Sequence, residues 1–365
     1  MFDPACRARA QTLITGRILP QPPPHPGKSA TIAGDEGPAH NVNPHPSPTA
    51  AGACYAPGYW PTWMLLGVMW LVAQLPYRLQ MGLGRMLGRM LAWIGHQRRG
   101  IAEVNLGLCF PELDATRRKA LLRDHFQSLG MGVVEIAMSW WTPEKRLRKL
   151  VRIEGLEHLD RALARGRGVI LLTGHFTSLE IGGRLLALFT PFHVLYRRHR
   201  NPLFEATMRR ARERNFDRAI PREDVRALLR SLKANMPVWY AADQDYGREQ
   251  SLFVPFFGVP AATIIATSRL AAHSGAAVVP FFQRRLADGS GYLLQLYPAL
   301  EDFPGATPEA DARRINGILE ERIREMPEQY LWVHRRFKTR PEGEAPLYAD
   351  MRKRGRRKSR SRKLD

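Results

Sequence analysis

The stretch GVILLTGHFTSLEIGGRLLALF, residues 168–189, decides the fold because it joins an apolar strand to a helix. Its first part, up to Thr173, is an uninterrupted run of aliphatic residues, which is typical of a strand covered on both faces in a parallel sheet. Its second part, over 178–189, repeats apolar residues at helical spacing. Gly174 and His175 then follow the C-terminal end of the strand, the edge at which open α/β sheets bind ligands.

Short apolar runs alternate with helical patterns through the rest of the chain. Further strands are predicted over 192–197, 236–242, 276–282 and 291–300. Helices are predicted between and after them, over 201–214, 222–234, 261–274 and 308–325. Fully apolar strands that alternate with helices predict a three-layer α/β/α domain with a mostly parallel sheet, which we place at 101–345.

A long helical pattern precedes the first strand, over 113–141. Asp114 is a candidate N-cap, because its side chain can accept a hydrogen bond from the first turn. Glycines lower helix propensity, so we expect a break near Gly130 and Gly132.

The N-terminal 100 residues divide into two segments. Residues 1–54 are rich in Pro, Gly, Ala and His, and they predict a disordered extension. The stretch 59–77 has no charged residue, and with its aromatic ends it is just long enough for a membrane helix, although a buried core helix is an alternative. We assign 55–100 to a membrane anchor.

The second part of that anchor, over 78–99, predicts an interfacial amphipathic helix. Arg78, Arg85 and Arg89 are spaced by seven and four residues and share one face, so they can reach lipid headgroups. The Lys and Arg residues that follow the apolar segment place the body of the protein in the cytoplasm.

The charge balance indicates an anionic partner. The formal net charge is +21, and the final 15 residues carry nine Lys or Arg residues and one Asp. We expect 346–365 to be a disordered basic tail that suits an anionic membrane surface, and RNA would suit it as well. The three cysteines, Cys6, Cys54 and Cys109, show no metal-binding spacing, so we expect no metal, no disulfide framework and a reducing compartment.

His175 and Glu180 are five residues apart, and this spacing limits how they can meet. Inside one helix they would stand roughly 140° apart. They can form a hydrogen bond only if His175 lies on the turn before the helix, where the carboxylate could fix the imidazole tautomer and raise its basicity. A simpler alternative also exists, because Thr177 and Glu180 match a capping box, which would give Glu180 a purely structural role.

The chain resembles the late acyltransferases of lipid A biosynthesis, within the lysophospholipid acyltransferase superfamily. The stretch TGHFTSLE matches that superfamily's motif of a histidine, four residues and an acid. Further landmarks occur in order over roughly 59–344, namely YWPTW, NLGLCFPEL, LYRRHRNP, VWYAADQDYG, VPFFGVPAAT and EQYLWVHRRFKTRPEGE.

The resemblance implies roles for individual residues. It makes His175 the general base and Glu180 its partner. It places a functional arginine at Arg212 and a functional acid at Asp243. Arg198 stands where relatives often have proline, so the chain departs from the family's pattern at this position.

Three further residues are candidates for substrate binding. Arg197, at a strand end, could bind a phosphate or an acidic sugar of the acceptor. Asp245 would point to a similar face as Asp243 if that segment is extended. Arg336 belongs to a basic cluster, HRRFKTRP, that we expect at the surface, where it could meet a phosphate, a carboxylate or an acidic carrier protein.

The predicted function is a membrane-bound acyltransferase without a cofactor. By resemblance, it moves an acyl chain from acyl carrier protein to a 3-hydroxyacyl chain of a lipid A precursor of the Kdo-lipid IVA type, at the cytoplasmic face of the bacterial inner membrane. No catalytic serine or cysteine pattern is seen, so we expect direct attack by the hydroxyl. One alternative is another glycolipid or phospholipid acceptor. A basic nucleic-acid-binding protein is a second, but no nucleic-acid-binding motif supports it.

Overall fold

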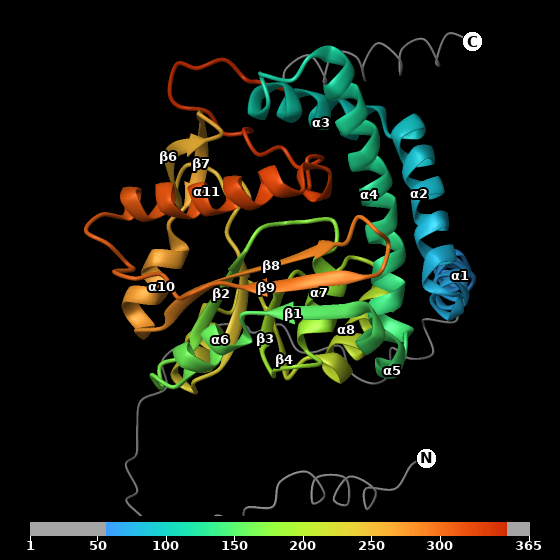
Figure 1. The fold of residues 1–365 in the computed structure, drawn as a ribbon, viewed down its shortest axis with the longest axis horizontal. Coiled ribbons are helices and arrows are strands. Elements are labelled where there is room, and N and C mark those ends of the chain that lie inside the picture. Colours follow the sequence, from blue (N-terminus) through green and yellow to red (C-terminus); the bar gives the residue numbers. More distant parts are fainter. Residues whose placement is uncertain (1–55, 349–365) are drawn as a thin grey trace, which may run out of the picture. The chain divides into compact units, whose positions relative to one another are not determined.

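The computed structural model describes residues 56–348, drawn in colour in Figure 1. The predicted extension over 1–54 lies outside the described residues, as does the basic tail after residue 348.

The fold centres on a seven-stranded sheet with the order β1-β9-β8-β2-β5-β3-β4. The strands are β1 (Val151–Glu154), β2 (Val169–Thr173), β3 (His193–Tyr196), β4 (Arg218–Pro221), β5 (Pro237–Ala241), β8 (Ala277–Arg285) and β9 (Tyr292–Leu296). Every pairing is parallel except that of β8 with β9. The predicted α/β class with a mostly parallel sheet is therefore confirmed.

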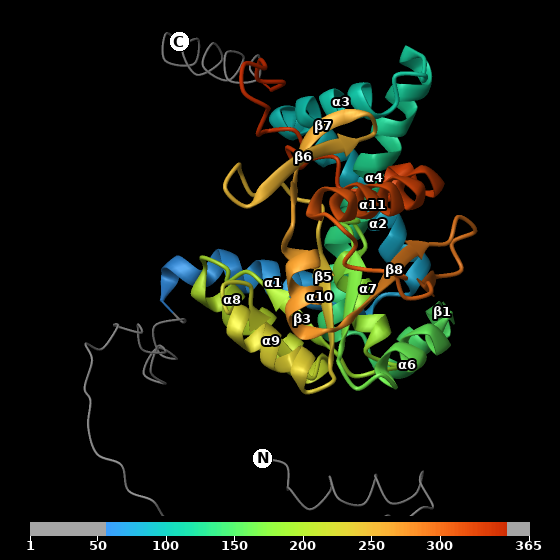
Figure 2. The same cartoon turned by 90° about the vertical axis from the view of Figure 1, so that its left-hand side faces the viewer.

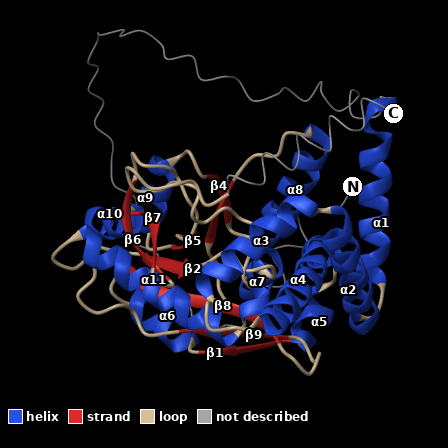
Figure 3. Ribbon diagram, turned by 90° about the horizontal axis from the view of Figure 1, so that it is seen from above, coloured by secondary structure: helices blue, strands red, loops and turns tan. Residues whose placement is uncertain are grey.

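Helices cover both faces of the sheet, as the view from above shows (Figure 3). One core contains Ile170 and Leu172 with α9 (Val225–Lys233), α10 (Ala266–Ser274) and α11 (Pro308–Glu325). The other contains Val169 and Leu171 with α6 (Leu156–Leu163), α7 (Leu179–Leu186) and α4 (Ala115–Trp141). Alternate residues of β2 thus enter opposite cores, which is why its first four positions are all aliphatic.

Several elements differ from the prediction. The helix expected over 261–274 begins only at Ala266, because the residues before it form β7 (Val259–Ile264), which pairs with β6 (Ser251–Phe256) as an antiparallel hairpin. The short edge strands β1 and β4 and the helix α6 were not predicted. An edge strand of four residues carries too little periodic signal to be recognised in a sequence.

The helix α4 is continuous over 27 residues, so the predicted break at its glycines is wrong. These glycines allow close packing instead. A Cβ atom on Gly130 would lie 2.2 Å from the carbonyl oxygen of Gly84, and one on Gly132 would lie 2.3 Å from that of Thr177. Asp114 caps the helix as predicted, since its side chain accepts from the backbone N–H of Arg117 at 2.8 Å.

The anchor predicted over 55–100 contains the first two helices, α1 and α2, and the start of a third, α3 (His96–Cys109). Within residues 56–348, no helix combines the length and the apolar content that crossing a bilayer requires. The predicted membrane helix over 59–77 is not supported, because α1 (Trp60–Gln74) has 15 residues and ends just before Pro76. Fifteen helical residues span ~22 Å, less than the ~30 Å of a hydrocarbon core.

The second helix, α2 (Tyr77–Ile94), packs along α4 (Figure 1), and α1 lies beside α8 (Pro202–Asn215) (Figure 2). Buried Gly84 and Gly88 face α4, while the three arginines of α2 are exposed. Both helices also expose many large apolar side chains: Trp60, Met64, Leu65, Val68, Trp70, Leu71, Leu79, Met86, Met90, Trp93 and Ile94.

Candidate active site

His175 lies on the turn between β2 and α7, at the C-terminal edge of the sheet. It precedes the first helical residue, Leu179, so the predicted position before the helix is confirmed. The C-terminal segment holds this turn. The backbone N–H of Leu331 donates to the carbonyl oxygen of His175 at 2.9 Å, and the N–H of Thr177 donates to that of Gln329 at 2.7 Å. These bonds fix the backbone on both sides of the imidazole.

Asp243 orients the imidazole. It follows β5, the strand next to β2, and its side chain is 1% exposed. Its Oδ1 lies 2.5 Å from His175 Nδ1, and its Oδ2 accepts from the backbone N–H of His175 and from the hydroxyl of Tyr330, both at 2.8 Å. An ionised carboxylate can only accept, so Nδ1 must carry a proton. In the neutral imidazole, Nε2 then holds the lone pair.

The pKa values agree with this assignment. Burial opposes ionisation of Asp243, but the charge of His175 and the hydrogen bonds from His175 and Tyr330 hold the pKa of the carboxyl well below its usual range. Burial lowers the pKa of His175, but the charge of Asp243 and the hydrogen bond to it outweigh burial, so the pKa of His175 is raised. Burial, followed by the charge of Asp243, raises the pKa of Tyr330 well above its ordinary value, so the phenol remains a donor.

Glu180 does not bind the imidazole, contrary to the predicted pairing. Both of its oxygens bind Arg212: Nε donates to Oε1 at 3.1 Å, and one terminal nitrogen donates to Oε2 at 2.7 Å. Trp140 Nε1 also donates to Oε1, at 3.4 Å. The planar guanidinium matches a carboxylate in this two-point geometry, which explains why Glu180 turns toward α8.

The capping box is not formed either. The first helical turn of α7 receives no side-chain hydrogen bond from its N-cap, Ser178. The hydroxyl of Thr177 is instead bound to Ser128 at 2.7 Å and to Arg285 at 3.0 Å. Thr177 therefore ties the turn to the interior, and Glu180 ties the following helix to α8.

A buried ion pair that the sequence did not reveal lies behind the turn. The Arg285 guanidinium donates to both oxygens of Glu135, at 2.5 and 2.9 Å, and to the hydroxyl of Ser128 at 2.6 Å. Glu135 also accepts from the Tyr292 hydroxyl at 2.8 Å. The partners are 150 residues apart, so no local pattern could have identified them.

Arg197 and Arg212 lie on different parts of the C-terminal edge of the sheet. Arg197 follows β3, is exposed, and lines a cavity of about 610 Å³ together with Arg198 and the acids Glu223 and Asp224. Arg212, in contrast, is engaged by Glu180, and its guanidinium lies 5.7 Å from the centre of the Tyr196 ring.

Asp245 and Arg336 are bound to other parts of the protein. Asp245 accepts from the backbone N–H and the hydroxyl of Thr339, at 2.7 and 2.8 Å, so it holds the C-terminal segment. Arg336 is 2% exposed, so its predicted surface position is wrong. Its guanidinium donates to the carbonyl oxygen of Ala262 and to the hydroxyl of Thr263, which places it within the β6–β7 region. No group of three or more His, Cys, Asp and Glu side chains within residues 56–348 is arranged to hold a metal ion.

Comparison with known proteins gives consistent matches over the described part of the chain. The family model "Bacterial lipid A biosynthesis acyltransferase" matches residues 50–339. The lipid A biosynthesis palmitoleoyltransferase of Escherichia coli (strain K12) is 45% identical over 80% of this chain and 95% of its own. The lauroyltransferase of the same organism is 40% identical over 82% and 99%, and the myristoyltransferase is 30% identical over 80% and 91%.

Proposed function

This chain belongs to the bacterial lipid A biosynthesis acyltransferase family and is an acyltransferase, and we propose that it transfers a fatty acyl group from acyl carrier protein to a hydroxyl of a lipid A precursor. The acceptor would be of the Kdo-lipid IVA type, and the reacting group would be the hydroxyl of a 3-hydroxyacyl chain. The acyl groups named for the relatives differ from one another, so the donor is proposed as a class of acyl thioester and not as one chain length.

The observation that carries the proposal is the His175–Asp243 pair. The Nδ1–H is held by Asp243, and within residues 56–348 Nε2 makes no hydrogen bond, while the side chain stays 22% exposed. Nε2 can therefore take the proton from an acceptor hydroxyl as its oxygen attacks the acyl thioester carbon. The thiolate of the carrier leaves and takes up the proton held on Nε2, which restores the neutral imidazole, so no covalent acyl-enzyme is required.

The base role stays with His175, but the orienting role moves to Asp243. Glu180 would act through Arg212, by holding that guanidinium at the edge of the sheet. A guanidinium fixed in this way suits the phosphate or acidic sugar of the acceptor. Arg197 is exposed at the same edge and would be a second contact for the anionic headgroup.

The location of the enzyme would be the cytoplasmic face of the inner membrane. The exposed apolar side chains of α1 and α2, interspersed with Arg78, Arg85 and Arg89, suit a helix pair that lies in the headgroup region. Apolar side chains could enter the acyl boundary while the arginines remain among the phosphates. Such an arrangement would present the sheet edge to a lipid acceptor.

A transfer assay with the full chain in mixed detergent–phospholipid micelles tests the proposal. We expect mass spectrometry to show that a lipid A precursor, incubated with acyl carrier proteins loaded with C12 to C16 chains, gains a single ester-linked acyl group. His175→Ala should lower the initial rate by ~10²–10⁴-fold, the usual worth of a positioned general base.

His158→Ala is the matched control, because His158 has the same side-chain exposure of 22% but lies on α6, away from the turn. A phospholipid or other glycolipid that accepts the chain in place of the lipid A precursor would favour the alternative acceptor. Equal rates for the His175 and His158 variants would refute the base role.

A further inference from the structure

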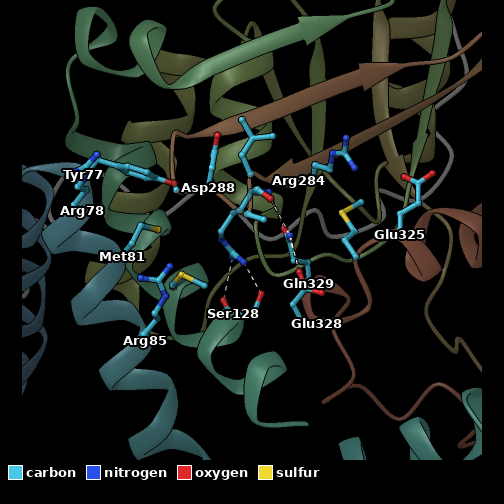
Figure 4. A pocket seen from close by; sticks show the side chains of 16 residues that line it. Tyr77, Arg78, Met81, Arg85, Ser128, Arg284, Asp288, Glu325, Glu328 and Gln329 are labelled. Atoms are coloured by element: carbon cyan, nitrogen blue, oxygen red, sulfur yellow. Dashed lines mark hydrogen bonds between the residues drawn. The ribbon is translucent and has the colours of Figure 1, made fainter. Parts of the chain in front are cut away.

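A second polar region lies outside the site of His175. A cavity of about 670 Å³ opens between α2, α4 and the turn after β8, and His175 is not among its lining residues (Figure 4). Arg85 from α2 and Arg284 from β8 lie on opposite sides of it, and Arg78 contributes a third guanidinium. The cavity therefore gathers positive charge from segments about 200 positions apart in the sequence.

None of these three guanidinium groups has a protein partner within the described part of the chain. Within residues 56–348, no hydrogen bond or ion pair engages the side chains of Arg78, Arg85 or Arg284, and the Nε–H of Arg284 is buried without an acceptor. A buried donor without an acceptor carries a free-energy cost. A ligand that supplies acceptor oxygens would remove this cost.

The acids and the fourth arginine of the cavity are already engaged within the protein. Glu325 pairs with Arg322 at 2.7 Å, Asp288 accepts from the backbone of Ser290 at 2.9 Å, and Glu328 accepts from Gln329 at 3.0 Å. Arg285, which also lines the cavity, is neutralised by Glu135. Asp288 and Glu328 keep their negative charge, but each already accepts a hydrogen bond from a neighbouring N–H group. Within the described residues, Arg78, Arg85 and Arg284 are the charged lining groups that have no partner, so they are the groups free to bind acceptor oxygens.

The surroundings of the cavity indicate a lipid. Leu79 and Met86 directly follow Arg78 and Arg85 in α2, and they are 57% and 62% exposed. A headgroup phosphate could enter the cavity while its acyl chains lie on these apolar side chains.

We propose that the cavity between α2, α4 and the β8–β9 turn binds the phosphate group of a membrane lipid. This is a discrete site for a single headgroup, distinct from a diffuse attraction between basic helices and an anionic bilayer. Guanidinium groups suit it because they offer several N–H donors to phosphate oxygens in a fixed geometry. The site is independent of the transfer reaction and should bind its ligand in an inactive enzyme.

Binding can be measured by isothermal titration calorimetry on the full-length His175→Ala variant in a non-ionic detergent. The titrant is monomeric dihexanoyl phosphatidylglycerol, and we expect saturable binding with a stoichiometry of one. Arg85→Gln and Arg284→Gln should each raise Kd about tenfold or more, since each removes a charged hydrogen-bond donor. Because Arg85 is exposed, its substitution should leave the fold intact, and an unchanged melting temperature would verify this.

Arg89→Gln is the matched control, because Arg89 is exposed on the same helix, one turn after Arg85, but does not line the cavity. Its Kd should change less than twofold. Equal weakening in the Arg85 and Arg89 variants would show that only diffuse charge acts and would overturn the proposal, as would the absence of saturation.

Two further titrants separate the sources of the phosphate. Inorganic phosphate should bind far more weakly, and an equal Kd would overturn the lipid assignment. A lipid A precursor that binds with the same dependence on Arg85 and Arg284, where phosphatidylglycerol does not bind, would retain the phosphate site and identify the acceptor glycolipid as its source.

Discussion

Two arginine–carboxylate pairs flank the turn that carries His175, and they differ in their access to solvent. In the first pair, Arg212 and Glu180 have side chains that are 15% and 21% exposed. In the second, Arg285 and Glu135 are 6% and 1% exposed. In both pairs, two nitrogens of the guanidinium donate to the two oxygens of the carboxylate, so the pairs differ mainly in their burial.

Neutral side chains donate to or accept from both members of the buried pair, whereas the outer pair is only partly covered by protein. Tyr292 and Ser128 bind the two partners of the buried pair, so its charges have little capacity left for a ligand. The Arg212 side chain stays 15% exposed, and its guanidinium lies 5.7 Å from the centre of the Tyr196 ring. We infer that the inner pair holds the turn in place and that the outer pair is available to substrate.

Glu135→Gln should have the largest effect. The change removes the charge that compensates buried Arg285, and breaking a buried pair on one side costs ~3–5 kcal/mol. Tryptophan fluorescence during denaturant unfolding in detergent would show a correspondingly lower free energy of unfolding. The double variant Glu135→Leu with Arg285→Met should lose less than the single one, since no unpaired charge remains. A single variant as stable as the unaltered protein would contradict the assigned role of this pair.

The sequence predicted what depends on local pattern and missed what depends on distant contacts. The apolar run of β2 predicted a buried strand, and the 100° step of a helix placed His175 before α7. The partner of His175 was missed, because Asp243 lies 68 residues further along and approaches only when β5 pairs with β2. Helix propensity predicts a break near Gly130, because it does not show that α2 packs against that position.

Asp243→Asn would distinguish two roles of this side chain: its hydrogen bonds, which support the turn, and its negative charge, which acts on the imidazole of His175. Loss of the carboxylate charge should lower the transfer rate by ~10²-fold, because the neutral amide no longer selects one tautomer. Since Asp243 raises the pKa of His175, its removal should lower that pKa. The base acts when unprotonated, so the acidic limb of the pH–rate profile should move to lower pH. A limb that stays in place would show that another group titrates.

Arg212→Gln should lower acyl transfer about tenfold, with a smaller loss of stability than Glu135→Gln. The Arg212 and Glu180 side chains are 15% and 21% exposed, so the loss should lie between the ~1 kcal/mol of an exposed pair and the ~3–5 kcal/mol of a fully buried one. The proposed substrate contact should appear as a higher KM for the acceptor and an unchanged KM for the proposed donor, acyl carrier protein. Equal changes in both KM values, or a large drop in melting temperature, would assign Arg212 a structural role like that of Arg285.

Arg209→Gln should have the smallest effect on transfer rate and stability, and it serves as the control for Arg212→Gln. Arg209 lies one turn before Arg212 on α8 and approaches Glu213 at 3.6 Å, but these side chains are 54% and 57% exposed. Water screens such a pair, so we expect a stability change below ~0.5 kcal/mol and a transfer rate within twofold of the unaltered protein. If Arg209→Gln impaired transfer as much as Arg212→Gln, the loss would follow from the net charge of α8, and the outer pair would have no specific role.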